Sequence, residues 1–521
     1  MNGSEAMVHT LLNNDVSVCF ANPGTSEMHF VSALDRVPQM RCILGLFEGV
    51  VTGAADGYYR MAQKPAATLL HLGPGLGNGL ANLHNAKRAR SGIVNIIGQH
   101  AHDHIANDAP LTSDIEGIAR PVSHWVRTCA SAATAAIDTA TAVHTASGTT
   151  GRIASLILPA DAAWGESPAG GASKLPQRPA APPASAVIET IAKQLLSGEY
   201  APESIALLLG GRAMRGQSPR LAGQIAARTG CKLFAETKNA RSERGAGRVN
   251  IPQIPYPING ALETLKDIRL IILVDACKPV AFFAYPNMPR FLTHSDCQIE
   301  ALATPDEDVE AALVALNDVV GGHRDQIAYM VERNTPPAWN DGAPNSVEMG
   351  RALASLIPEN TIIVDEAITT GRQLQSSAAV GKPHDWLEIT GGSIGYGLPC
   401  ATGAAIACPD RKVVAIIGDG SAMYTVQSLW TMAREGLDVT VVICANSKYQ
   451  ILSGELDAMG GPPPSGNAKR MLSIGSPTLD WVHLARGHGL QATRTDTMAG
   501  FAKALSNGLS AGEPNLIEVI I

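Results

Sequence analysis

Short, almost continuously apolar runs alternate with helix-like stretches along the whole chain. Near the start, Val16–Gly24, Ala66–Gly75 and Gly92–Gln99 read as strands, and Glu48–Ala62 between them has a helical pattern. The alternation continues with strands at Ser204–Gly211, Leu270–Ala276, Thr361–Ala367, Lys412–Gly420 and Val439–Asn446, and with a helix at Ser218–Thr229. Apolar strands separated by helices are typical of parallel sheets covered on both faces. The pattern therefore predicts an α/β protein.

Two stretches rich in Pro, Gly, Ala and Ser interrupt this alternation. Gly165–Ser185 and Asn334–Ser346 lack a periodic apolar pattern and read as linkers. A chain of 521 residues is too long for a single core. We therefore predict three doubly wound parallel-sheet domains, at residues 1–164, 186–333 and 347–521.

Composition excludes several classes of protein. The net charge is −7 and no run of Lys and Arg occurs, so a nucleic-acid or membrane partner is not expected. The nine Cys are scattered without a Cys-x-x-Cys motif, which argues against a disulfide framework or a zinc ribbon. The start lacks a basic signal region, and no apolar run reaches the ~20 residues of a membrane helix. We expect a soluble, cytoplasmic protein.

Polar residues follow two strands of the last segment. Asp419 and Asn446 each end an apolar run, and the carboxyl ends of parallel strands meet at one edge of a sheet. Gly418 and Gly420 would let a ligand approach the backbone, and a helix expected from Ser421 would favour phosphate at its start. Carboxylate, amide and phosphate oxygens suit Mg²⁺. Gly-Asp-Gly is also a common turn, but the strand–helix–strand spacing favours a binding site.

These residues carry a resemblance to a known family. Gly-Asp-Gly followed by Asn after the next strand resembles the diphosphate-binding signature of thiamine-diphosphate-dependent enzymes. Phe20–Phe30, Leu44–Ala67 and Gly391–Ser421 also fall where the family has its motifs. Within the family the chain is most similar to the benzoylformate decarboxylases, and then to the acetolactate synthase large subunits.

The resemblance implies a role for each of the three domains. The first would bind the pyrimidine of thiamine diphosphate and the third its diphosphate, with a middle domain between them. In the family the cofactor lies between the first domain of one subunit and the third domain of its partner. A homodimer or homotetramer with active sites at the subunit interface is therefore expected.

Three residues of the first segment match the family's catalytic positions. Glu48 matches the glutamate that binds N1′ of the aminopyrimidine and thereby promotes removal of the thiazolium C2 proton. The alternative for Glu48 is an acidic first-turn residue facing a helix dipole. His71 matches a catalytic histidine of benzoylformate decarboxylase that transfers protons. Thr25 aligns with a serine that binds the substrate carboxylate, and Ser26 beside it is the rival.

The resemblance also implies a set of residues in the last segment. Asp419, Asn446 and the main-chain carbonyl of Lys448 correspond to the Mg²⁺ ligands. Ile394 would wedge the cofactor into its bent shape, unless it is simply a core residue, and the Gly392 carbonyl would accept from N4′. The other residues predicted to contact the cofactor are Gly418, Gly420, Ser421, Tyr449 and Ile451.

Some positions depart from the family pattern. The decarboxylase's second histidine has no counterpart, because Phe282 and Phe283 stand near its place, and this favours carboligation over aldehyde release. Ile451 replaces an alanine and narrows the acyl pocket, which favours small aliphatic 2-oxo acids such as pyruvate by ~1–3 kcal/mol. Pro110 and Leu111 stand where the synthase has an aromatic residue and an amide.

His100, His102 and His104 alternate after an apolar run. On a strand they would share one face and could bind a metal. Beyond a strand end they are loop residues or line the active site, and this second interpretation is favoured because no acidic second shell is arranged around them.

We therefore predict thiamine-diphosphate- and Mg²⁺-dependent decarboxylation of a 2-oxo acid, with carboligation of the resulting acyl unit as a further outcome. The alternative within the family is an acetolactate synthase-type carboligase, so the enzyme is a lyase or a transferase. An alternative of another class is a flavin- or NAD-dependent oxidoreductase. No strand runs into a Gly-x-Gly-x-x-Gly helix and no convincing FAD signature occurs, so FAD is not supported as a cofactor.

Overall fold

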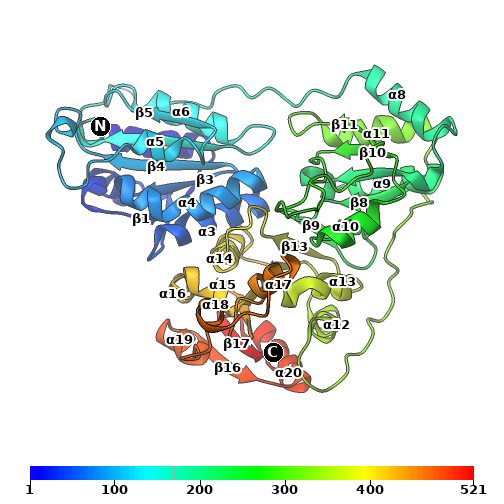
Figure 1. Ribbon diagram of the computed structural model, residues 1–521. Coiled ribbons are helices and arrows are strands. Elements are labelled where there is room, and N and C mark those ends of the chain that lie inside the picture. Colours follow the sequence, from blue (N-terminus) through cyan, green and yellow to red (C-terminus); the bar gives the residue numbers. More distant parts are fainter. Residues whose placement is uncertain (169) are drawn as a thin grey trace.

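The computed structural model describes residues 1–168 and 170–521 and contains three sheets, each flanked by helices (Figure 1). The first sheet has six strands in the order β2-β1-β3-β4-β6-β5, and all of its pairings are parallel. Its strands are β1 Val18–Asn22, β2 Arg41–Leu44, β3 Ala66–Leu70, β4 Ile93–Gln99, β5 Trp125–Thr128 and β6 Ile153–Pro159. The helices of this segment are α1 Gly3–Asn13, α2 Met28–Arg36, α3 Glu48–Ala62, α4 Leu72–Ala89, α5 Ile115–Ala119, α6 Ala135–Ala146 and α7 Ala160–Trp164.

The second sheet has four parallel strands in the order β11-β10-β7-β8. These are β7 Ile205–Leu209, β8 Lys232–Ala235, β10 Leu270–Val274 and β11 Gln298–Ala303. The helices of this segment are α8 Ser185–Leu196, α9 Ser218–Thr229, α10 Ile258–Leu265 and α11 Val309–Val320. Its core is separate from that of the other two sheets.

The third sheet has seven strands in the order β16-β17-β15-β14-β12-β13-β9. The strands are β12 Thr361–Glu366, β13 His384–Glu388, β14 Val413–Gly418, β15 Val439–Ala445, β16 Gln491–Thr495, β17 Asn515–Ile520 and β9 Ser242–Arg244. The helices are α12 Ser346–Leu356, α13 Leu374–Ala378, α14 Gly397–Ala407, α15 Asp419–Ala422, α16 Ser428–Glu435, α17 Gln450–Ala458, α18 Gly466–Leu472, α19 Trp481–Gly487 and α20 Met498–Ala511.

The predicted α/β fold with three parallel-sheet units is confirmed, with one exception. Strand β9 comes from the middle segment, yet it pairs antiparallel with β13 and forms the edge of the third sheet. This crossing could not be predicted from the sequence, because three residues are too few to show a periodic pattern. The linker Gly165–Ser185 contains no helix or strand in its described part before α8 begins at Ser185.

Two expected element boundaries are wrong. The run Ala66–Gly75 is a strand only as far as Leu70, and α4 begins at Leu72, so that His71 is its N-cap. The helix expected from Ser421 begins at Asp419 and is only four residues long, followed by a 3-10 turn over Met423–Thr425. By contrast, α3 and α9 occupy the predicted ranges.

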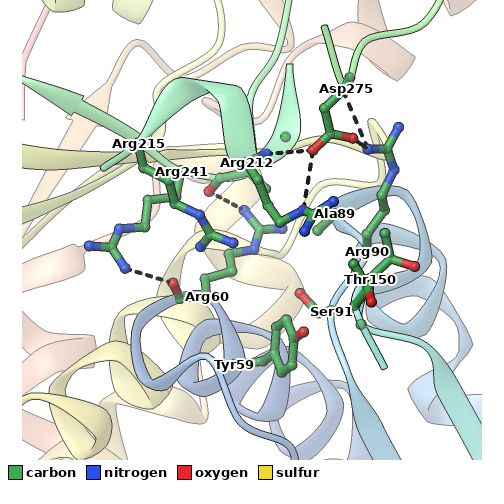
Figure 2. A pocket seen from close by; sticks show the side chains of 14 residues that line it. Tyr59, Arg60, Ala89, Arg90, Ser91, Thr150, Arg212, Arg215, Arg241 and Asp275 are labelled. Carbon is green, nitrogen blue, oxygen red and sulfur yellow. Dashed lines mark hydrogen bonds and ion pairs between the residues drawn. The ribbon is translucent and has the colours of Figure 1, made fainter. Parts of the chain in front are cut away.

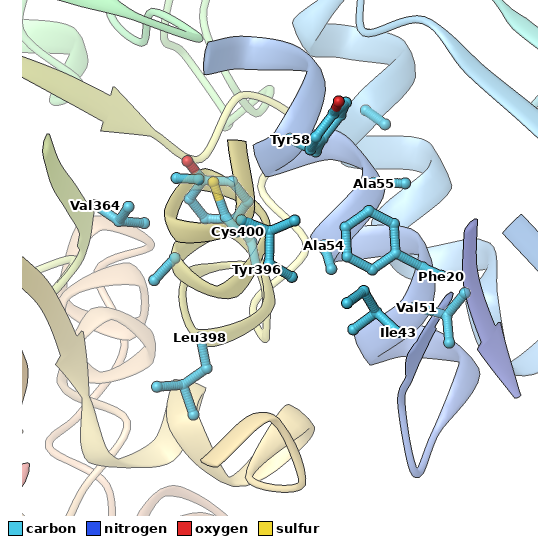
Figure 3. Packing of buried hydrophobic residues seen from close by; sticks show 14 of the residues in the cluster. Phe20, Ile43, Val51, Ala54, Ala55, Tyr58, Val364, Tyr396, Leu398 and Cys400 are labelled. Atoms are coloured by element: carbon cyan, nitrogen blue, oxygen red, sulfur yellow. The ribbon is translucent and has the colours of Figure 1, made fainter. Parts of the chain in front are cut away.

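Helices α3 and α14 pack closely and join the first segment to the last (Figure 3). Glycines make this possible, because a Cβ at Gly57 would lie 2.1 Å from the Cys400 carbonyl oxygen and one at Gly403 would lie 1.8 Å from that of Ala54. Arg60 of α3 also donates to the Glu388 carbonyl at 2.7 Å. In the described residues no helix has the length and hydropathy of a membrane span.

Candidate active site

Glu48 is the first residue of α3 and is only 7% exposed. Asn78 of α4 donates its side-chain amide to Oε2 at 3.0 Å. No hydrogen bond to Oε1 is found within the described part of the chain, so this oxygen can bind a ligand nitrogen. Gly75 lies beside it, since a Cβ there would be 3.0 Å from Oε1 and 3.2 Å from the His71 Cβ. Glu48 and His71 therefore flank the same glycine, at the start of α4.

His71 pairs with a buried carboxylate that the sequence did not reveal. Its Nδ1 lies 2.8 Å from Oε2 of Glu27, which is 3% exposed. Glu27 also accepts the backbone N–H of Gly24 at 2.8 Å and the Ser26 hydroxyl at 2.6 Å. A Cβ at Gly24 would lie 2.1 Å from His71 Nδ1, so only glycine fits there. Glu27 thus fixes the ring of His71 and leaves Nε2 for other contacts.

The two candidate hydroxyls next to this pair differ in position. Ser26 Oγ lies 3.3 Å from Nδ1 of His71, whereas Thr25 is exposed at the start of the 3-10 turn Thr25–Glu27. Ser26 is therefore the hydroxyl beside His71, but it donates its proton to Glu27, so that Thr25 keeps a hydroxyl that can donate to a ligand.

In the last segment, Asp419 follows β14 and is 4% exposed. Its carboxylate accepts the backbone N–H of Gly420 at 2.9 Å and that of Ser447 at 2.7 Å. Burial raises the pKa of Asp419, and none of the ion pairs in the described residues includes it. A buried carboxylate without a basic partner is costly unless a cation neutralises it. This group therefore fits a divalent cation such as Mg²⁺.

The residues after β15 lie beside Asp419. Asn446 Oδ1 accepts the backbone N–H of Lys448 at 3.0 Å. Lys448 pairs with Ser473 as an isolated bridge, and the Tyr449 N–H donates to the Leu472 carbonyl at 2.9 Å.

The aromatic ring of Tyr449 lies over the turn that follows β14. It lies against Gly420, where a Cβ would approach the ring to 2.4 Å. The structure therefore brings Gly418, Asp419, Gly420, Ser421, Asn446, Lys448 and Tyr449 to one end of the sheet, and Ile451 lies in the first turn of α17.

The loop before α14 carries Gly392 and Ile394. Gly392 has a φ of +78°, and a Cβ there would lie 3.1 Å from the Phe282 ring of the middle segment. Glu366, buried at the end of β12, accepts the N–H groups of Gly395, Tyr396 and Gly397 at 2.8, 3.0 and 2.8 Å. Glu366 was not predicted from the sequence as a site residue, although an acidic residue at the end of an apolar strand is a recognisable signal. Ile394 is partly buried against the core.

His100, His102 and His104 lie in the loop after β4. The Nδ1 of His102 lies 2.9 Å from Oδ2 of Asp161, and the rings of His100 and His104 touch. Among the described residues no three His, Cys, Asp or Glu side chains are gathered as for a metal ion. The histidines thus lie beyond the strand end, as the favoured interpretation required.

A separate cavity lies elsewhere, at the junction of the first and middle segments (Figure 2). It measures about 50 Å³ and adjoins a cavity of about 660 Å³. Asp275, at the end of β10, lies against Arg90 and accepts the backbone N–H of Arg212 at 2.7 Å. Burial and the nearby Arg241 and Arg212 guanidiniums lower the pKa of Arg215. The arginines that line the cavity are Arg60, Arg90, Arg212, Arg215 and Arg241.

Comparisons with known proteins agree with this geometry. Residues 1–119 match the model of the N-terminal TPP binding domain of thiamine pyrophosphate enzymes, and residues 370–519 match that of the C-terminal TPP binding domain. These ranges contain Glu48 and His71 on one side and Asp419 and Asn446 on the other.

Proteins that are similar over the whole length of this chain indicate the same family. A Mycobacterium tuberculosis protein provisionally named acetolactate synthase large subunit IlvX is 45% identical over 100% of this chain and 99% of its own. The benzoylformate decarboxylase of Pseudomonas aeruginosa is 28% identical over 99% and 98%. The structure of a Rhodococcus jostii thiamine diphosphate-dependent 4-hydroxybenzoylformate decarboxylase superposes with a TM-score of 0.84 at 24% identity, covering 100% and 99% of the two chains. With both binding domains and full-length relatives in agreement, this chain belongs to the thiamine pyrophosphate enzyme family, among its decarboxylase and acetolactate synthase-like members.

Proposed function

We propose that the protein decarboxylates a 2-oxo acid with thiamine diphosphate and Mg²⁺. The observation that carries this proposal is the carboxyl group of Glu48, which is buried, held on one oxygen by Asn78 and free on the other. A carboxyl group of this kind can hold or release a proton at a ring nitrogen of a bound cofactor. When bound, thiamine diphosphate supplies a carbon nucleophile that protein side chains lack.

Different residues of this chain would bind different parts of the cofactor. Asp419, Asn446 and the Lys448 carbonyl would hold Mg²⁺ and through it the diphosphate, with Gly418, Gly420, Ser421 and Tyr449 around them. Gly392 and Ile394 would support the middle of the cofactor. These assignments rest on the buried carboxylate of Asp419, which has no ion-pair partner among the described residues, and on Asn446 and Lys448 beside it.

His71 is proposed to move protons to and from the substrate. Its Nδ1 lies against Glu27, so Nε2 is the nitrogen that can face a ligand. Thr25, the predicted residue, would donate to the substrate carboxylate, because it is exposed, whereas Ser26 donates its single hydroxyl proton to Glu27.

The finer chemistry follows from side chains near the loop of Gly392. Phe282 lies against Gly392 where a proton donor would complete aldehyde release, and this supports transfer of the acyl unit to a second carbonyl. Joining two 2-oxo acids, as in an acetolactate synthase-type reaction, is the alternative outcome. Ile451 favours a small aliphatic acyl group such as that of pyruvate.

Assembly and location are part of the same proposal. Active sites shared between two subunits require a homodimer or a homotetramer. A cytoplasmic location is consistent with the nine free cysteines of the chain.

A second candidate of another class is a flavin- or NAD-dependent oxidoreductase. The arginine-lined cavity at the ends of β7 and β10, together with the adjoining cavity of about 660 Å³ that Lys87, Arg88 and Arg152 line, favours an anionic ligand near the strand ends, where α/β sheets bind nucleotides. An absorption spectrum of the purified protein decides this point. Flavin absorption would favour the second candidate, and its absence together with activity would exclude a flavin requirement.

The main test uses purified protein with thiamine diphosphate, Mg²⁺ and a panel of aliphatic and aromatic 2-oxo acids. We expect CO₂ release, with aldehyde and acyloin or acetohydroxy acid separated afterwards by chromatography. Omission of Mg²⁺, with chelator present, is the control and should abolish CO₂ release. If no acid yields CO₂ and the cofactor C2 proton does not exchange with deuterium, the proposal is wrong.

A further inference from the structure

Two buried asparagines of α4 connect the catalytic glutamate segment to the loop Thr390–Gly395, which carries Gly392 and Ile394. Asn82 donates its side-chain amide to the Gly49 carbonyl at 2.8 Å and to the Gly395 carbonyl at 3.1 Å. Gly49 follows Glu48 in α3, and Gly395 follows Ile394. One amide nitrogen therefore touches the backbone next to both proposed functional residues.

Asn85 lies one helical turn after Asn82 and contacts both Asn82 and the same loop. Its amide nitrogen donates to Asn82 Oδ1 at 3.0 Å and to the Ser393 carbonyl at 2.7 Å. Its Oδ1 accepts the Ser393 N–H at 3.2 Å, and its main-chain carbonyl accepts the Thr390 hydroxyl at 3.1 Å. Asn82 and Asn85 are 2% and 0% exposed. Each amide uses both of its N–H donors, so neither can move without leaving a buried polar group unpaired.

Apolar packing alone would hold these segments together, because α3 and α14 already interlock (Figure 3). Apolar contacts tolerate sliding, whereas a satisfied amide network selects one relative position. His84, between the two asparagines and turned toward solvent, contacts the Gly391 carbonyl at 3.0 Å. The loop is therefore held by three residues of one helix of the first segment.

We propose that Asn82 and Asn85 are positioning residues that hold the Glu48 turn and the loop Thr390–Gly395 in one fixed register. This inference rests on the proposed function, because it assigns a cofactor role to each segment, to the Glu48 turn at one of the two interface sites of the proposed dimer and to the loop at the other. Asn82 acts on both segments and Asn85 on the loop alone. The two variants should therefore differ in a defined way.

The test compares Asn82→Ala and Asn85→Ala with Asn95→Ala as a matched control. Asn95 is equally buried, with side-chain partners Thr68 and Ser155 in the first sheet, and touches neither segment. The first readout is amide hydrogen exchange of the cofactor-free protein, followed by mass spectrometry. Both α4 variants should speed exchange at the amides of residues 391–397 about tenfold, equivalent to ~1.4 kcal/mol, and Asn95→Ala should not.

The second readout is the cofactor itself, by calorimetry and by NMR of C2 deuterium exchange at saturating cofactor. Asn85→Ala should raise the Kd of thiamine diphosphate about tenfold. Asn82→Ala should also slow C2 exchange about 100-fold, since misplacement by about 1 Å has that effect. Asn95→Ala should lower only the melting temperature.

Three outcomes decide the proposal. If both α4 variants behave like Asn95→Ala in loop exchange and in cofactor binding, they are merely structural and the proposal is overturned. If Asn82→Ala does not fold, the loop exchange of Asn85→Ala decides it. A wild-type protein that binds no thiamine diphosphate removes the proposed function and with it the positioning role, while loop exchange still reports whether the link exists.

Discussion

The two halves of the candidate site are held in different ways. In the first segment, side chains hold side chains, as Glu27 holds His71 at 2.8 Å and Asn78 holds Glu48 at 3.0 Å. In the last segment the backbone holds a side chain, since the Asp419 carboxylate accepts two main-chain N–H groups. A backbone-held site depends on a local motif, whereas a side-chain-held site depends on residues that meet only in the fold. Single substitutions at supporting residues should therefore damage the first half more.

The largest effect is expected at Glu48. Glu48→Gln removes the proton-transferring carboxyl but keeps its size, so C2 deuterium exchange of bound thiamine diphosphate should slow by about 10²–10⁴-fold. NMR of the cofactor at saturating concentration measures this rate. Exchange at the wild-type rate would contradict the catalytic assignment.

A similar substitution in the backbone-held half should affect binding instead. Asp419→Asn removes the proposed anionic ligand, and we expect the Kd of thiamine diphosphate with Mg²⁺ to rise about 100-fold. Calorimetry measures the change, with Asp438→Asn as an acidic control, because Asp438 forms an ion pair with Lys412. Unchanged affinity in Asp419→Asn would exclude Asp419 as a metal ligand.

Glu27 tests whether support by side chains matters. Glu27→Gln keeps a hydrogen bond to His71 but removes the charge, and turnover should fall about 10–100-fold with little change in KM. Steady-state kinetics with the preferred 2-oxo acid measures both constants. An equal rise in KM with constant kcat would show that Glu27 serves substrate binding rather than His71.

The adjacent hydroxyls give a smaller effect with an internal control. Thr25→Ala should raise KM about tenfold, because Thr25 keeps a hydroxyl proton for the substrate, whereas Ser26→Ala should change KM less than about twofold, because Ser26 donates its proton to Glu27. Both variants are compared in the same kinetic assay. The reverse order of effects would make Ser26 the substrate hydroxyl.

The last prediction concerns stability and its dependence on pH rather than activity. Burial raises the pKa of Glu366 to about 7, although the hydrogen bonds from its three N–H donors lower it. Because the folded pKa lies above the unfolded one, the stability that Glu366 contributes is present at low pH and lost as pH rises through about 7. Between pH 5 and 8 the free energy of unfolding should therefore fall less in Glu366→Gln than in the wild-type protein. The difference should be at most about 3 kcal/mol. Denaturant unfolding across that pH range tests this, and identical pH curves would contradict it.

The same contrast explains what could be predicted from the sequence. Asp419 and Asn446 were visible because the backbone-held motif is contiguous with two apolar strands. The range of α3 and its first residue, Glu48, were also predicted. Glu27 and Asn78 were not, because their roles arise from contacts across 44 and 30 positions.

The errors in the last segment have a similar cause. The turn at Asp419 was expected to continue as a helix from Ser421, yet it is broken into short pieces by the loop geometry. Strand β9 was missed because three residues outside their own segment carry no periodic signal.

Strand β9 has a practical consequence for dissecting the protein. The outer edge of β13 is covered by residues Ser242–Arg244, which lie more than a hundred positions earlier in the chain. A truncated gene encoding only residues 347–521 would leave that edge bare, and bare edges recruit strands from other molecules. We expect such a fragment to aggregate on expression, whereas a version that carries β9 on a tether would not.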